Sequence, residues 1–237
     1  MTTEPIVAPH AAGEDLMPLH GIDHVELWTG NAAQAAYFYV NALGFTEVAY
    51  AGLETGVRDR VSHVLQQGRI RLVLTGALTP GHEIGDHHRR HGDGVRDIAL
   101  SVPDAAGAYR TALARGARGV REPWEAADEH GVVRMATIAT YGDTLHTFVD
   151  RGDYHGPYLP GFVARHGAPA AGDCGLLAID HIVGNVELGH MATWVRFYED
   201  VFGMTEMLHF SDEAISTEYS ALMSTVSYTH LTLPTKA

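Results

Sequence analysis

Histidine is the residue type in this sequence with the greatest potential for metal chemistry, with 16 copies among 237 residues. His181 directly follows Asp180 and interrupts AIDHIV, an apolar run typical of a buried strand. A histidine at such a position is either a hydrogen-bonded core residue or a metal ligand, and spacing alone favours the core residue. Cys174 is the single cysteine, which excludes an intrachain disulfide and a multi-cysteine metal site.

A second histidine-rich stretch, HEIGDHHRRH at 82–91, suggests a comparison with zinc-binding helices. Glu83 follows His82 as in the HExxH motif, but position 86 is aspartate instead of the second histidine. Gly85 weakens the helix that paired ligands would need. The sequence therefore favours a solvated loop or a short surface helix here over a zinc site.

Hydrophobic periodicity and cap signals predict the elements that position these residues. A strand is predicted at 22–28, followed by a helix that Asn31 caps and Gly44 ends. Residues 45–51 predict a second strand, and alternating apolar residues at 60–75 predict a hairpin. The order of this first unit is β-α-β-β-β.

A second unit with the same order follows. A strand is predicted at 94–102, and Asp104 and Gly116 bound a helix. A short strand comes next, and then VVRMATIAT and TLHTFVD predict two strands joined by a tight turn at Gly142. The order is again β-α-β-β-β.

The first unit then recurs after an irregular segment. Three matches link its two copies in order: Ile22-Asp23-His24 with Ile179-Asp180-His181, Phe38-Tyr39 with Phe197-Tyr198, and Thr46-Glu47 with Thr205-Glu206. They fall on a strand, a helix and a strand, which indicates an internal repeat. The repeat predicts an α+β fold of paired βαβββ modules whose strands curl into half-open barrels.

The repeat also predicts the domain plan. We expect a flexible tail at 1–20, a two-module N-terminal domain at 21–150 and a linker at 151–177, where glycine and proline break the periodicity. Residues 178–226 supply most of one module of a second domain, which we expect to be incomplete. Residues 227–237 do not continue the pattern, and we interpret them as foreign sequence in preference to a frayed C-terminus.

Charge and hydropathy argue against several classes of partner. The net charge of −13 argues against nucleic-acid binding through a basic surface. No apolar run approaches the roughly 18 residues of a membrane span. The N-terminus has no basic region followed by an apolar one, so we expect no secretory signal and a cytoplasmic protein.

Several long stretches resemble the 4-hydroxyphenylpyruvate dioxygenase family over about residues 20–226. They are GLETGVRDRVSHVLQQGRIRLVLT, HGDGVRDIAL, ATYGDTLHTFVDR, IDHIVGNVELG and SDEAISTEYSALMS. The resemblance implies the vicinal-oxygen-chelate (glyoxalase/bleomycin-resistance-like) fold, in agreement with the repeat. It implies a non-haem Fe(II) oxidoreductase of tyrosine catabolism that converts 4-hydroxyphenylpyruvate and O₂ to homogentisate and CO₂. It also implies a homo-oligomer.

The resemblance assigns His181 as the first of three iron ligands, two histidines and a glutamate. The other two would come from a fourth module, and His230 stands at the wrong spacing to replace either. Because one imidazole does not make a facial triad, we expect no dioxygenase activity from this polypeptide alone. The resemblance places Val183 and Ser224 in the substrate pocket. Ala214 stands where the family often has an acidic residue.

In the first half of the chain, His24, Asp97 and Thr147 occupy the positions equivalent to the iron ligands. The resemblance does not place iron there, and Thr147 would be a poor third ligand. We expect His24 and Asp97 to be hydrogen-bonded inside a packed barrel. Two other functions stay open at this point. One is 4-hydroxymandelate synthase, a relative that uses the same substrate, and the other is a non-catalytic small-molecule-binding protein of the same fold.

Overall fold

A computed structural model of the chain describes residues 17–167, 172, 174–210, 216–217, 220–221 and 224–228. Its helices are α1 (Ala32–Leu43), α2 (Glu83–His91), α3 (Ala105–Ala114) and α4 (Met191–Phe202), with a 3-10 turn η1 (Leu53–Thr55). Its strands are β1 (Gly21–Trp28), β2 (Thr46–Ala51), β3 (Arg60–Gln67), β4 (Ile70–Ala77), β5 (Gly94–Ser101), β6 (Gly119–Asp128), β7 (Gly131–Ala139), β8 (Leu145–Asp150), β9 (Val163–Ala164), β10 (Thr205–Phe210), β11 (Ser216–Thr217), β12 (Ser220–Ala221) and β13 (Ser224–Tyr228).

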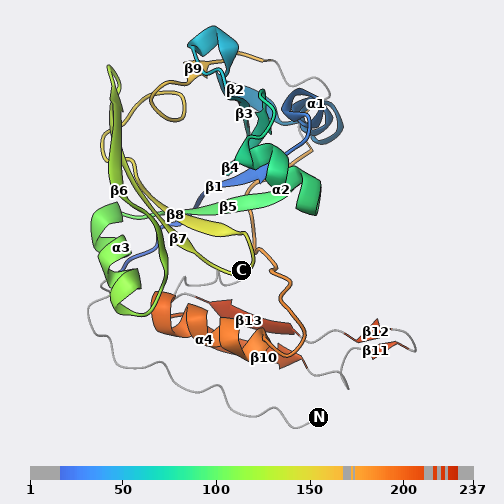
Figure 1. Cartoon of the computed structure of the whole chain (residues 1–237), viewed down its shortest axis with the longest axis vertical. Helices are drawn as coiled ribbons and strands as arrows, with labels where there is room; N and C mark the ends of the chain where they lie inside the picture. The colour runs from blue at the N-terminus through green and yellow to red at the C-terminus, as the bar shows by residue number, and fades with distance from the viewer. Residues whose placement is uncertain are drawn as a thin grey trace.

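One curled sheet of nine strands forms the centre of the structure, in the order β6-β7-β8-β5-β1-β4-β3-β2-β9. Figure 1 shows α1 and α3 on the outer side of the curl. Strand β1 pairs in parallel with β4 and antiparallel with β5, and β5 pairs in parallel with β8. Two β-α-β-β-β modules therefore join at β1 and β5, which confirms the predicted order and fold class. Strand β6 is longer than the short strand predicted there.

Asn31 and Gly44 set the ends of α1, as predicted. Asn31 Oδ1 accepts a hydrogen bond from the Gln34 backbone N–H at 3.0 Å, which satisfies one of the unpaired donors of the first turn. Gly44 has a left-handed φ of 72°, and its N–H donates to the Val40 carbonyl at 3.2 Å. Between these caps, α1 buries Ala36 against the first module.

Replacing Asn31 by alanine should lower the free energy of unfolding by about 1 kcal/mol, because the first turn of α1 loses its side-chain acceptor. Asn31→Asp keeps an oxygen at the same position and should stay close to the unsubstituted protein. Urea denaturation of the three proteins measures both differences. If both variants lose the same free energy of unfolding, the side-chain oxygen at position 31 does not account for the stability.

The segment after β8 packs against the inner face of the sheet. Tyr158 is buried beside Val64 and Val73, and its hydroxyl lies 3.0 Å from His24 Nε2. Strand β9 then pairs with the edge strand β2. The sequence predicts 151–177 as a linker. The first part of this range instead packs into the core of the sheet and adds a strand to its edge.

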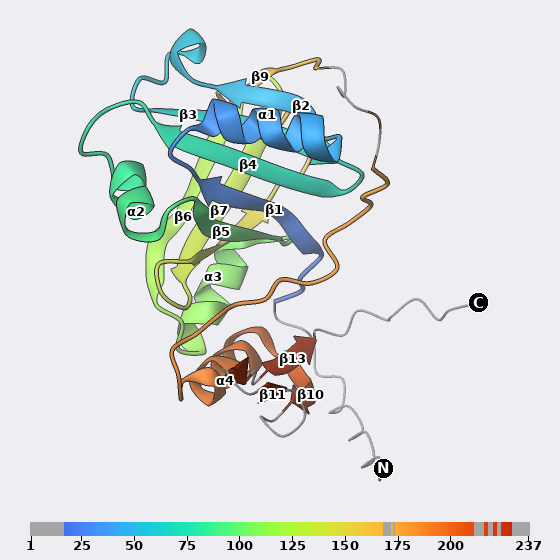
Figure 2. The same cartoon turned by 90° about the vertical axis from the view of Figure 1, so that its right-hand side faces the viewer.

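The outer face of the second module is covered by segments from both ends of the described chain. Met17, within the predicted tail 1–20, is buried in the core cluster around α3. Val201 and Phe202 of α4 are buried in the same cluster, where Phe202 meets Phe148 of β8. Figure 2 shows α4 below α3. Helix α4 therefore docks on the second module, although the repeat assigns it to the third.

Residues 174–190 contain neither helix nor strand, although the repeat predicts the counterpart of β1 there. The backbone N–H and C=O groups of β1 are paired with β4 and β5. Within the described ranges no strand lies beside 178–186, so this stretch has no ladder to join. Several apolar side chains of 174–190 are correspondingly exposed, among them Leu177, Val183 and Leu188. The predicted strand is therefore absent, whereas α4 and β10 form where the repeat places them.

Candidate functional site

His181 lies in this irregular segment with its side chain 68% exposed. Its Nδ1 is 2.8 Å from Asp180 Oδ2. A ferrous facial triad needs three convergent ligands. Within the part of the chain that the structure describes, the one group of three His, Cys, Asp or Glu side chains able to hold a metal ion lies elsewhere. The surroundings of His181 therefore do not fit a complete iron site, and its role as a ligand stays a prediction.

The two predicted substrate contacts lie on different segments of the chain. Val183 has an exposed side chain two residues after His181. Ser224 begins β13, where its backbone pairs with Phe210 of β10. Ala214 and His230 lie outside the described residues. The substrate-binding roles of Val183 and Ser224 stay predictions.

The corresponding residues of the first half are buried, and each has hydrogen-bond partners. His24 Nδ1 lies 2.7 Å from Asp23 Oδ1, and its Nε2 contacts the Tyr158 hydroxyl. Asp97 accepts hydrogen bonds from both the backbone N–H and the hydroxyl of Thr147. His24, Asp97 and Thr147 are all buried. The structure thus confirms the expectation that His24 and Asp97 are hydrogen-bonded inside a packed barrel.

Glu26 is a partly buried acid in this interior that sequence reasoning missed. It stands opposite Asp97 in the β1–β5 pairing, and its Oε1 accepts from the Thr75 hydroxyl at 2.6 Å. Burial raises the pKa of Glu26, and the nearby charge of Asp97 raises it further. The period-two alternation of β1 places Glu26 on the same face as His24, which could have revealed it.

The stretch 82–91 folds as a short helix, as predicted, but one of its histidines is not on the surface. His87 is buried, and its ring packs edge-on against Trp28. His91 lies one turn later on the same helix face, with its ring centroid 4.6 Å from that of His87. The HExxH motif counts its spacing from His82, so it does not reveal the i, i+4 pair formed by His87 and His91.

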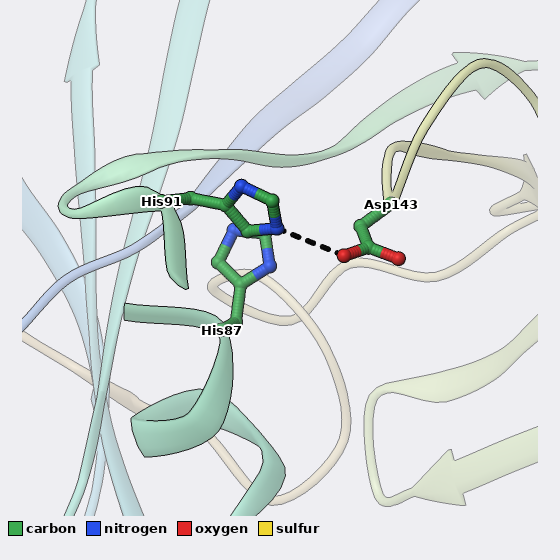
Figure 3. Close-up of side chains that lie close together, drawn as sticks. All are labelled: His87, His91 and Asp143. Carbon is green, nitrogen blue, oxygen red and sulfur yellow. Dashed lines mark hydrogen bonds and ion pairs between the residues drawn. The ribbon is translucent and has the colours of Figure 1, made fainter. Parts of the chain in front are cut away.

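Asp143 completes this group from the turn between β7 and β8. Figure 3 shows its carboxylate facing the two imidazoles. His91 Nε2 lies 2.8 Å from Asp143 Oδ2, and one ligand atom from each of the three residues lies within 4.8 Å of the others. Gly142 adopts a left-handed φ of 56° in this turn, a conformation that glycine tolerates without strain. The three side chains form a group able to hold a metal ion.

The curled sheet of paired modules matches a known family. Residues 21–146 match the model described as the Glyoxalase/Bleomycin resistance protein/Dioxygenase superfamily. The chain belongs to this superfamily. The matched range runs from β1 into β8, so the superfamily fold accounts for both modules of the sheet.

Relatives within this superfamily cover more of the chain. It is 44% identical over 214 residues to 4-hydroxyphenylpyruvate dioxygenase from Dictyostelium discoideum, a match that covers 88% of the chain and 58% of that protein. It is 42% identical to the enzyme of the same name from Xenopus tropicalis, with 92% and 56% covered. A mutant of 4-hydroxymandelate synthase from Streptomyces coelicolor has a TM-score of 0.71 at 30% identity, with 82% and 56% covered. The chain spans little more than half the length of these proteins.

Proposed function

We propose that this chain forms part of an Fe(II)-dependent 4-hydroxyphenylpyruvate dioxygenase, which converts 4-hydroxyphenylpyruvate and O₂ to homogentisate and CO₂. The observation that carries the proposal is the 44% identity to the Dictyostelium discoideum enzyme. A match over 88% of a 237-residue chain includes both the sheet and the segment around His181. The superfamily fold supports the same conclusion.

In this proposal the two halves of the chain have different roles. Residues 21–150 form the N-terminal domain, 151–177 connect it onward, and 178–226 belong to the catalytic domain. His181 provides one of three iron ligands, and the other two come from outside the described residues. Bound iron would supply the oxygen chemistry, while Val183 and Ser224 contact the substrate. Among the described residues, no helix is long and apolar enough to span a membrane.

A chimera tests the proposal. The part of the Dictyostelium discoideum relative that extends beyond the match is joined to this chain after residue 226. We expect the chimera to bind iron and to form homogentisate, and His181→Ala to lower the rate by more than about 100-fold. Loss of an outer-shell partner alone typically costs about 10–100-fold in metal affinity or activity. The unextended 237-residue chain should form no homogentisate.

The control variant is His166→Ala in the same chimera, because His166 is an exposed histidine distant in sequence from His181. It should keep the iron content and the rate of the chimera. If the active chimera keeps its rate after His181→Ala, His181 is not an iron ligand. Homogentisate from the unextended chain would overturn the expectation that ligands from outside it are required.

A second candidate is 4-hydroxymandelate synthase, which the structural similarity to the Streptomyces coelicolor protein favours. The higher identity to the dioxygenases makes it the less supported candidate. The synthase hydroxylates the benzylic carbon and the dioxygenase the ring, so the two functions give different products. To separate the chain's own contribution from that of the added part, a second chimera carries the corresponding part of the Streptomyces coelicolor protein. 4-Hydroxymandelate from both chimeras would favour the synthase, and homogentisate from both would favour the dioxygenase.

A further inference from the structure

We propose that His87, His91 and Asp143 form a binding site for a divalent transition-metal ion such as Zn²⁺, separate from the iron site of the proposed function. Two histidines come from consecutive turns of α2, and the aspartate comes from the β7–β8 turn. Imidazole nitrogen and carboxylate oxygen are the donors that zinc shares with copper, nickel and cobalt. Three protein ligands would leave one coordination position for water.

The geometry needs only small side-chain movements to receive an ion. Ligands of a tetrahedral zinc ion stand about 2.0–2.2 Å from the metal and hence about 3.3 Å from one another. The three ligand atoms already lie within 4.8 Å of one another. His91 Nε2 and Asp143 Oδ2 lie 2.8 Å apart, and the ion would take the place of this hydrogen bond. Rotation about the side-chain bonds of His91, which is 44% exposed, provides the remaining adjustment.

The surroundings of His87 fix the orientation of its ring. Its ring is fixed by the edge-on contact with Trp28, at 5.3 Å between centroids. Burial lowers the pKa of His87, and the nearby His91, Arg96 and Arg90 lower it further.

Two arginines contact Asp143, one at its carboxylate and one at its backbone carbonyl, and they set the expected strength of the site. Arg90 Nη1 lies 2.9 Å from Asp143 Oδ2, and Arg96 donates to the Asp143 backbone carbonyl. The hydrogen bond from His91 and the charges of Arg90 and Arg96 lower the pKa of Asp143, so its carboxylate stays ionised. Both guanidinium groups also repel a cation. The site therefore binds a metal more weakly than a closed structural zinc site does.

A bound ion would fasten α2 to the turn before β8. These segments lie about fifty residues apart in sequence, and side chains on the surface now connect them. A ligand that binds only the folded state stabilises it in proportion to the logarithm of its concentration. With Zn²⁺ at about 100-fold over its dissociation constant, we expect the midpoint of thermal unfolding to rise by about 5–10 °C.

The test is metal titration of the untagged, chelator-treated 237-residue chain. Calorimetry with Zn²⁺ measures affinity and stoichiometry, and visible absorption with Co²⁺ reports the coordination geometry. His91→Ala and Asp143→Asn should each weaken Zn²⁺ binding by more than about 10-fold and abolish the thermal shift. Both side chains are substantially exposed, so these variants should fold, and circular dichroism checks that they do. Arg90→Ala should tighten binding, because it removes a repelling charge and frees an oxygen.

His88→Ala is the matched control. His88 lies on the same helix, but its Nε2 is paired with Asp93 at 3.2 Å, outside the proposed ligand set. This variant should keep the affinity, the thermal shift and the Co²⁺ spectrum of the unsubstituted chain. The proposal is overturned if folded His91→Ala and Asp143→Asn bind Zn²⁺ as tightly as His88→Ala, because the ion would then be held by other histidines of the chain.

Discussion

Replacing Arg151 by methionine should lower the free energy of unfolding by about 3–5 kcal/mol, because it leaves the buried carboxylate of Asp23 without its main partner. Arg151 Nε and Nη2 each lie 2.7 Å from an oxygen of Asp23, whose side chain is only 5% exposed. This bidentate pair ties β1 to the segment after β8. Arg71 at 3.5 Å and His24 at 2.7 Å remain near Asp23, which favours the lower end of that range.

The control for this prediction is an exposed ion pair of the same chemistry. Arg134 and Glu125 lie 2.8 Å apart on neighbouring strands, with both side chains about half exposed. Arg134→Met should cost less than about 1 kcal/mol. Chemical denaturation of both variants gives the two free energies. If Arg151→Met is as mild as Arg134→Met, the buried pair does not hold the segment after β8 on the sheet.

The pH dependence of stability should also report the pair of Asp23 and Arg151. Burial alone would raise the pKa of Asp23, but hydrogen bonds from Arg151 and His24 hold it well below its usual range. A carboxyl with a depressed folded-state pKa contributes its full stability above the unfolded value, about 3.9, and loses it as the pH falls toward the folded value. Stability should therefore decline below about pH 5, and Arg151→Met should flatten that decline.

Truncation of Phe202 to alanine should also cost about 3–5 kcal/mol, since it opens a cavity in a core that α4 shares with the second module. Phe202 is 5% exposed, and its ring lies 5.4 Å from that of His146 and 6.2 Å from that of Phe148. It also stacks with Tyr198, whose hydroxyl lies 3.0 Å from His146 Nε2. Loss of Phe202 should release α4 from α3.

Chemical denaturation and hydrogen exchange of the α4 amides measure this effect together. Arg196→Ala is the matched control, because Arg196 lies on the exposed face of the same helix and its removal should change stability by less than about 0.5 kcal/mol. Faster exchange of α4 in Phe202→Ala but not in Arg196→Ala is the expected result. Equal exchange in both variants would mean that α4 does not depend on this contact.

Local sequence signals predicted most of the sheet because its modules are built from short-range patterns. Asn31, Gly44 and Asp104 cap their helices as predicted, and strand alternation gave the order of both modules. The repeat at His24 and His181 predicted paired βαβββ modules, in agreement with the superfamily that the resemblance implied and the family match showed. These features depend on neighbouring residues, so a sequence reveals them directly.

Tertiary structure decided what depends on partners distant in the chain. The segment around His181 has the apolar pattern of β1 but forms no strand, because a strand needs a neighbouring ladder for its backbone groups. The apolar face of α4 requires a partner surface, and the tertiary structure shows that this surface belongs to the second module. Likewise, the i, i+4 spacing of His87 and His91 is visible in the sequence, but only folding brings Asp143 from another module to face them.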